Sequence, residues 1–144
     1  MENVVSTIKN TLADRILEIR EISPRQNFIS VSHDHIYDVT EYLFSKMGGR
    51  LATVSGVDCQ EAIDILYHFC FDSRGQAVTV KTKLGKSNLK IRSITPFLPG
   101  AEWIEREIHD LLGVEFIDHP NLKRLILADD WPEGVYPLRK DQTQ

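Results

Sequence analysis

The amino-acid sequence predicts an α+β fold: a single compact domain with a mostly antiparallel sheet, helices on one face of it, and an irregular, proline-rich C-terminal strap. Three observations support this prediction. Apolar residues recur at helical spacing in the first third of the chain. Three strand-like runs then follow one another with short turns between them. Five of the six prolines lie after residue 95, where they interrupt regular structure.

Two helices and a short strand are expected before residue 48. The first helix spans residues 4–20, whose apolar residues fall four or three apart on one helical face: Val4, Ile8, Leu12, Ile16 and Ile19. A short strand follows at residues 27–32. The second helix begins at Ser32 or Asp34, either of which is a good N-cap, and continues to about Met47. Gly48 and Gly49 then end it.

The middle of the chain predicts an antiparallel meander of three strands, over residues 50–57, 62–71 and 76–84. The third run alternates most clearly, because Val78 and Val80 are interleaved with threonine and lysine. Turns are expected at residues 56–58 and 73–75, the second with a glycine available for positive φ. Residues 89–94 form a further strand or an extended connection.

The last third of the chain predicts one helix and then irregular structure. The helix begins at Gly100 or Ala101, runs to Leu112 and is ended by Gly113. The C-terminal strap, residues 114–144, is apolar yet shows no regular pattern, so we expect it to lie on a surface. Residues 1–98 are therefore the α+β sheet part, and residues 99–144 are the helix and strap of the same domain.

Composition excludes several classes of protein. A chain of 144 residues, 42% hydrophobic and 26% charged, is typical of one globular domain. Its net charge of −4 provides no basic field for nucleic acid. Two cysteines, Cys59 and Cys70, are too few for an iron–sulfur cluster in this chain, and we expect both in the core. No apolar run approaches the length of a membrane span, so we expect a soluble chain.

The helix over residues 101–112 carries most of the charged residues that suggest a function. Glu102, Arg106 and Asp110 are four apart, a spacing that forms ion pairs of about 0.2–0.5 kcal/mol each. Glu107 and Asp110 also lie beside the apolar stripe, which predicts contact with cations in this chain or in another. The cations available in this chain are Arg124, Arg139 and Lys140.

Other polar and aromatic residues allow two interpretations each. Glu105, Glu107 and Asp110 fit a proton relay or, more commonly, a structural ion-pair network. His109 and His119 are more often hydrogen-bonded than metal-bound. A basic run is expected to be a solvated strand face: Lys81, Lys83, Lys86, Lys90 and Arg92. Trp103 suits the core or an interface, whereas Trp131 and Tyr136 favour an interface.

A family resemblance joins these features. The run Glu-Arg-Glu-x-x-Asp-Leu-Leu-Gly-Val at residues 105–114 resembles the signature of the 30 kDa subunit of respiratory complex I, also called its C subunit. The resemblance spans residues 93–141 and continues through Phe116, residues 119–124, Asp130-Trp131 and residues 137–141. Residues 131–137 look more like the versions in membrane-bound [NiFe] hydrogenases and related energy-converting complexes. The authentic C subunit of an NADH:quinone-type complex I is the alternative.

The resemblance implies a scaffold subunit without cofactor, metal or catalytic residues of its own. It would pack against a large catalytic subunit with a [NiFe] centre or a quinone site, and near a small iron–sulfur subunit. Membrane subunits would anchor it indirectly on the cytoplasmic side, and nucleic acid is not expected as a partner. The residues expected in structural or interface roles are Glu102, Trp103, Glu105, Arg106, Glu107, Asp110, Gly113, His119, Pro120, Arg124, Trp131, Tyr136, Arg139, Lys140 and Asp141.

Two hypotheses of other classes stand beside this one. The first is a free-standing enzyme that uses the acidic helix for acid–base chemistry, and it predicts a pocket around Glu105, Glu107 and Asp110. The second is a protein-interaction module outside respiration.

Overall fold

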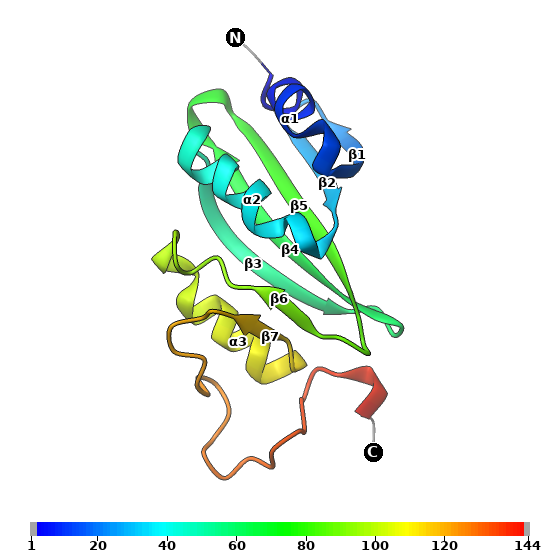
Figure 1. The fold of residues 1–144 in the computed structure, drawn as a ribbon, viewed down its shortest axis with the longest axis vertical. Helices are drawn as coiled ribbons and strands as arrows, with labels where there is room; N and C mark the ends of the chain where they lie inside the picture. Colours follow the sequence, from blue (N-terminus) through cyan, green and yellow to red (C-terminus); the bar gives the residue numbers. More distant parts are fainter. Residues whose placement is uncertain (1–2, 143–144) are drawn as a thin grey trace.

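The structure is a computed structural model that describes residues 3–142 (Figure 1). Its helices and strands, in chain order, are α1 (Val4–Leu12), β1 (Ile16–Ser23), β2 (Gln26–Val31), α2 (Ile36–Glu41), β3 (Arg50–Asp58), β4 (Ala62–Phe71), β5 (Gln76–Gly85), β6 (Lys90–Arg92), α3 (Glu102–Leu112) and β7 (Glu115–Ile117). A π-helical segment, Tyr42–Lys46, extends α2, so the helix predicted to reach about Met47 is confirmed.

Five strands form the main sheet in the order β1-β2-β5-β4-β3. All neighbours pair antiparallel except β2 and β5, which are parallel and are separated in the sequence by α2, β3 and β4. The predicted meander is confirmed as β3, β4 and β5. A separate two-stranded parallel sheet pairs β6 with β7 and so ties the strap to the segment before α3. The α+β prediction is confirmed.

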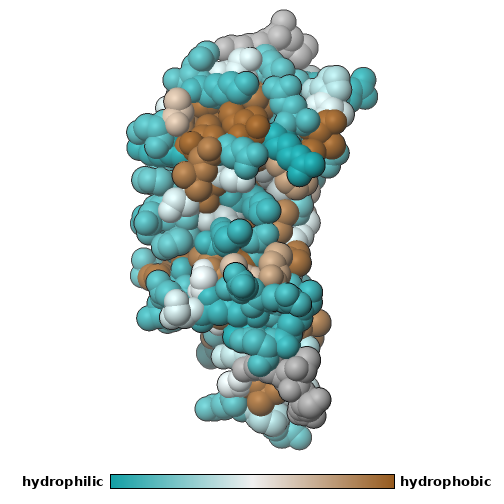
Figure 2. Space-filling model, turned by 90° about the vertical axis from the view of Figure 1, so that its right-hand side faces the viewer, coloured by the Kyte–Doolittle hydropathy of each residue, from teal (hydrophilic) through white to brown (hydrophobic). Residues whose placement is uncertain are grey.

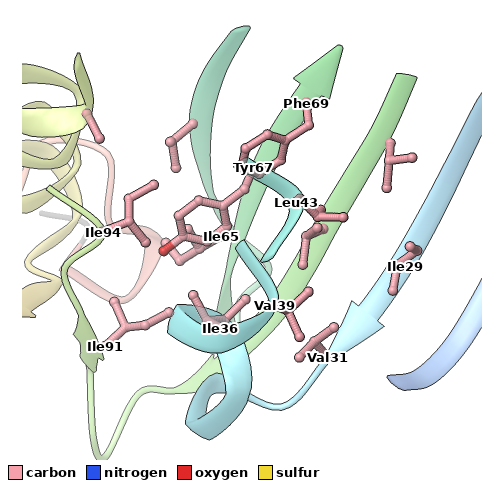
Figure 3. Packing of buried hydrophobic residues seen from close by; sticks show 14 of the residues in the cluster. Ile29, Val31, Ile36, Val39, Leu43, Ile65, Tyr67, Phe69, Ile91 and Ile94 are labelled. Atoms are coloured by element: carbon pink, nitrogen blue, oxygen red, sulfur yellow. The ribbon is translucent and has the colours of Figure 1, made fainter. Parts of the chain in front are cut away.

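The core lies on the face of the sheet that the helices cover. Ile65, Tyr67 and Phe69 alternate along β4 and are buried toward α2, where Ile36 and Val39 meet them (Figure 3). Their neighbours Leu66, His68 and Cys70 point to the uncovered face and are half-buried. There His68 hydrogen-bonds both Ser55 Oγ, at 3.1 Å, and Thr79 Oγ1, at 3.0 Å. One face is therefore apolar and the other polar, as expected for a sheet covered on one side.

The predicted helix over residues 4–20 is wrong after Leu12. Residues 16–23 form β1, in which Leu17 and Ile22 interrupt the register with β2 and have no partner residue. Each is the extra residue of a bulge. The bulge at Leu17 puts Ile16 and Ile19 opposite Val31 and Ile29 on the covered face, although residues three apart in a regular strand lie on opposite faces. A bulged strand thus imitates helical spacing.

The same bulges expose apolar side chains at the edge of the sheet. Leu17 is 73% exposed and Ile22 is 49% exposed. Figure 2 shows a mainly hydrophilic surface, with its largest apolar area toward the end of the molecule that carries α1 and β1.

Cys59 is also exposed, in the turn after β3, which corrects the prediction that both cysteines lie in the core.

Helix α3 packs on the other edge of the covered face. Gly56 of β3 permits this approach, since a Cβ there would lie 2.6 Å from the Leu112 side chain. The helix ends, as predicted, at Gly113, whose φ of 79° is the left-handed conformation that favours glycine. Within residues 3–142, no helix combines the length and apolar character needed to cross a membrane.

Candidate functional site

The candidate site is the junction between α3 and the C-terminal strap. Arg106 donates from Nε to the Lys123 carbonyl oxygen at 3.0 Å and from Nη2 to the Arg124 carbonyl oxygen at 2.8 Å. One turn later, Asp110 Oδ2 accepts the N–H groups of residues 125, 126 and 127 at 2.7, 2.8 and 3.2 Å. Two side chains of one helix therefore hold five consecutive backbone residues of the strap.

These contacts replace the predicted ion pairs. Within the described residues, Arg106 forms no ion pair with Glu102 or Asp110, because its guanidinium donates to carbonyl groups. Asp110 is 2% exposed, and its expected cationic partner is replaced by three backbone N–H groups. Burial alone would raise the pKa of Asp110, but the three donors outweigh burial and hold the pKa below its usual value.

Glu105 fastens α3 to the segment after β6 from inside the core. Its side chain is fully buried, and it accepts hydrogen bonds from the Ser93 hydroxyl at 2.6 Å, from the Thr95 hydroxyl, and from the Ile94 N–H at 3.1 Å. Burial raises its pKa, and the three donors only partly oppose that shift. Burial also raises the pKa of Tyr67, helped by the nearby Glu105 carboxylate. Glu105 thus links α3 to residues 93–95 inside the core.

His119 joins the strap to the first turn of α3. The Asn121 N–H donates to Nδ1 at 3.0 Å, which places the ring proton on Nε2, where it is donated to the Glu102 carbonyl oxygen at 3.0 Å. The ring is therefore neutral, and its 3.9 Å separation from Glu105 Oε1 is not an ion pair. At the other end of the helix, His109 Nδ1 lies 2.8 Å from the Val114 carbonyl oxygen. Across residues 3–142, no group of three or more potential ligands is arranged to hold a metal ion.

The end of the strap returns to the sheet. Arg139 makes a bidentate ion pair with Asp141, at 2.7 and 2.6 Å, and also donates to the Leu112 carbonyl oxygen at 3.1 Å. The Lys140 N–H donates to Asp58 Oδ2 at 2.7 Å, and Lys86 Nζ lies 2.8 Å from Asp58 Oδ1. The predicted cation for the α3 acids is therefore neither Arg139 nor Lys140. Asp58 was missed, because nothing in the sequence links the end of β3 to residue 140.

Two carboxylates at this end are held ionised. Burial would raise the pKa of Asp58, but donors from Lys86, Lys140 and Gln60 together lower it. The Arg139 guanidinium lowers the pKa of Asp141 well below its usual range. The predicted basic surface is correspondingly divided among separate partners: Lys81 pairs with Asp64, Lys86 with Asp58 and Asp141, Lys90 with Glu115, and Arg92 lies 3.6 Å above the Tyr37 ring.

The remaining predicted residues divide into exposed and half-buried groups. Trp103, Glu107, Pro120 and Lys140 are exposed, and Trp103 is 65% exposed, which favours an interface over the core. Glu102, Arg124, Trp131 and Tyr136 are half-buried. The strap also exposes apolar residues that sequence analysis did not single out, since Leu125 is 36%, Ile126 57% and Leu138 55% exposed. The feature of the sequence that could have identified them is the apolar composition of an irregular segment.

Comparison with family models and with curated proteins identifies one family. The family model described as "Respiratory-chain NADH dehydrogenase, 30 Kd subunit" matches residues 29–144. The C subunit of F(420)H(2) dehydrogenase from Methanosarcina mazei is 31% identical over 96% of this chain and 89% of its own length. Hydrogenase-4 component G of Escherichia coli K12 is 31% identical over 97% of this chain. This chain spans only 26% of that protein and 21% of formate hydrogenlyase subunit 5 from the same organism.

Solved structures show the same fold. A chain in the structure of the membrane-bound sulfane sulfur reductase, an archaeal respiratory membrane complex, has a TM-score of 0.83 and 26% identity, with 96% of this chain and 82% of that chain covered. The trypsin-resistant fragment of Nqo5 has a TM-score of 0.72 and 17% identity, with 84% of this chain and 100% of that chain covered. This second likeness supports the fold alone.

Proposed function

Because this chain belongs to the family of the 30 kDa subunit of respiratory-chain NADH dehydrogenase, we propose that it is a non-catalytic scaffold subunit of a membrane-associated respiratory oxidoreductase. It packs against the large catalytic subunit through the C-terminal strap. The observation that carries the proposal is that the backbone and the side chains of the strap have different surroundings. Polar side chains of its own domain hold its backbone, while several of its apolar side chains face outward.

This arrangement suits a preformed interface. Arg106 and Asp110 order residues 123–127 before any partner arrives, so association loses less conformational entropy. Burying a large apolar side chain completely is worth about 1.5–3 kcal/mol. Leu125, Ile126 and Leu138, which are partly exposed, together with Trp103 supply the kind of apolar and aromatic contacts that dominate binding.

The arrangement also favours a structural role over acid–base catalysis. Glu105 and Asp110 are both buried, and both already accept three hydrogen bonds from their own chain. Glu107 is exposed on the outer side of α3. The three acids therefore do not converge on one reacting centre, and the structural interpretation of this helix is the one we adopt.

Within the family, we favour the energy-converting [NiFe]-hydrogenase type. The likeness to hydrogenase-4 component G and formate hydrogenlyase subunit 5 supports this branch. Likeness to the C subunits of F(420)H(2) dehydrogenase and of NADH-quinone oxidoreductase from Geobacter sulfurreducens supports the alternative, an authentic complex I subunit. In either case we place the [NiFe] centre or quinone, and the iron–sulfur clusters, in partner subunits. The chain is then peripheral, on the cytoplasmic side of the membrane.

The test is retention in the complex. The double variant Leu125→Ser/Ile126→Ser should reduce the amount of this chain that co-purifies with a tagged large subunit by about tenfold, a loss of about 1.4 kcal/mol. Leu17→Ser is the matched control, because Leu17 is more exposed but lies on β1, far from the strap (Figure 1). Retention of the double variant at the level of the control would refute the proposal.

A further inference from the structure

A pocket of about 290 Å³ lies between the second half of α3 and the turn at residues 131–136 of the strap. Its functional lining consists of His109, Asp110, Arg124, Trp131, Glu133 and Tyr136. The Trp131 indole N–H donates to the Val135 carbonyl oxygen at 2.7 Å and closes the turn. Gly134, with a φ of 77°, allows the tight reversal. The pocket is therefore built by fixed backbone rather than by a loose loop.

Two carboxylates, those of Asp110 and Glu133, lie among the residues that line this pocket. Asp110 accepts its three strap N–H groups through Oδ2, so Oδ1 is the second acceptor that this carboxylate offers. His109 donates from Nδ1 to the Val114 carbonyl oxygen, so this nitrogen is already used within the chain. Glu133 is exposed and has no cation within ion-pair distance among the described residues. Trp131 and Tyr136 add aromatic surface, which attracts cations.

The charges of the lining residues favour a cation as well. The two carboxylates, Asp110 and Glu133, share the lining with one guanidinium, that of Arg124, whose Nη1 already donates to the carbonyl oxygens of Ala128 and Asp129 at 2.8 and 3.0 Å. Two carboxylates against one guanidinium leave an excess of negative charge beside two aromatic rings, which favours an incoming ammonium or guanidinium over an incoming carboxylate.

We propose that this pocket binds one basic side chain, an arginine or lysine, supplied by the partner subunit. The identity of the partner rests on the proposed function, but the preference for a cation does not. The pocket adjoins residues 125 and 126, so a charged contact would sit beside the exposed apolar surface of the strap. A charged anchor next to apolar contacts would fix the register in which the two subunits dock.

The preference for a cation is tested on the isolated full chain by NMR. Titration with ethylguanidinium chloride should give saturable shifts in the amide signals of residues 109–110 and 131–136, whereas sodium propionate at the same concentration should not. Glu133→Gln should weaken ethylguanidinium binding by about threefold. Asp130→Asn, a neighbouring exposed acid that does not line the pocket, should leave binding unchanged. Shifts with propionate instead, or equal binding by Glu133→Gln and the wild-type chain, would overturn the proposal.

The role of the partner is tested separately, in the complex. Glu133→Lys should lower retention on the tagged large subunit by about tenfold, and Asp130→Lys should lower it far less. If ethylguanidinium binds but neither Glu133→Lys nor the apolar double variant affects retention, the cation site stands and the scaffold proposal fails. If only the apolar double variant affects retention, the scaffold proposal stands and the basic side chain comes from elsewhere, which overturns the docking role of the pocket.

Discussion

The five-stranded sheet and the C-terminal strap satisfy their backbone hydrogen-bonding groups in opposite ways. In the sheet, neighbouring strands satisfy the backbone of each other, and the side chains of β4 are free to pack against α2. In the strap, the backbone of residues 123–127 has no strand partner, so buried and half-buried side chains of α3 satisfy it. Side chains of the strap are then free to face outward. An irregular segment held in this way can present its own side chains as a binding surface. Polar side chains of the helix beneath it are then needed to satisfy its backbone.

The largest effect on stability should come from removing the Asp110 carboxylate, which accepts three backbone hydrogen bonds from the strap. Asp110→Ala leaves three N–H groups without their acceptor, and we expect a loss of about 3 kcal/mol in the free energy of unfolding. Denaturant unfolding measures that loss. Hydrogen exchange should show the strap amides of residues 125–127 exchanging faster while those of β4 and β5 keep their protection. Glu107→Ala, in the same helix but exposed, should change stability by less than about 0.5 kcal/mol.

A smaller effect should follow from crowding the point where the strap passes the end of α3. A Cβ at Gly113 would lie 2.6 Å from the Tyr136 ring, and φ is positive there. We expect Gly113→Ala to cost about 2–3 kcal/mol. Gly134→Ala is a matched control, since Gly134 has nearly the same φ but open space around it, and it should cost only about 1 kcal/mol. Thermal unfolding of both variants separates crowding from backbone strain, and equal losses would contradict the packing of Tyr136 on Gly113.

The smallest effect concerns pH, and the buried carboxyl groups should respond in opposite directions. The pKa of Glu105 is raised in the folded state, so its contribution to stability is complete below its unfolded pKa of about 4.3 and is lost as pH rises through the folded value. The pKa values of Asp58 and Asp110 are lowered, so their contributions are present above the unfolded values and are lost as pH falls. Urea unfolding from pH 4 to 8 should show that the free energy of unfolding of Glu105→Gln lacks the decline that the wild-type chain shows as pH rises. Parallel curves for the variant and the wild-type chain would show that Glu105 holds the same protons folded and unfolded.

Sequence reasoning succeeded where the determinants are local. Alternation identified β4 and β5 because each strand has one buried and one polar face, and Gly113 marked the end of α3. It failed at β1, where a bulge at Leu17 imitates helical spacing. It recognised α3 as important but assigned the wrong partners to Arg106 and Asp110. Their partners are backbone groups 15–18 residues away, and backbone groups leave no mark in a sequence.

The bulges of β1 also affect how readily two copies of the chain could pair with each other at this edge. Strand β1 lies at the end of the sheet, next to β2 alone, and an open strand edge is a template for aggregation between copies. Two bulges within eight residues interrupt the regular ladder that a second copy would need. The same two positions expose Leu17 and Ile22 to solvent, so the protection at these positions lies in backbone irregularity. At this edge of the sheet, a second copy of the chain therefore meets an interrupted strand rather than a regular one.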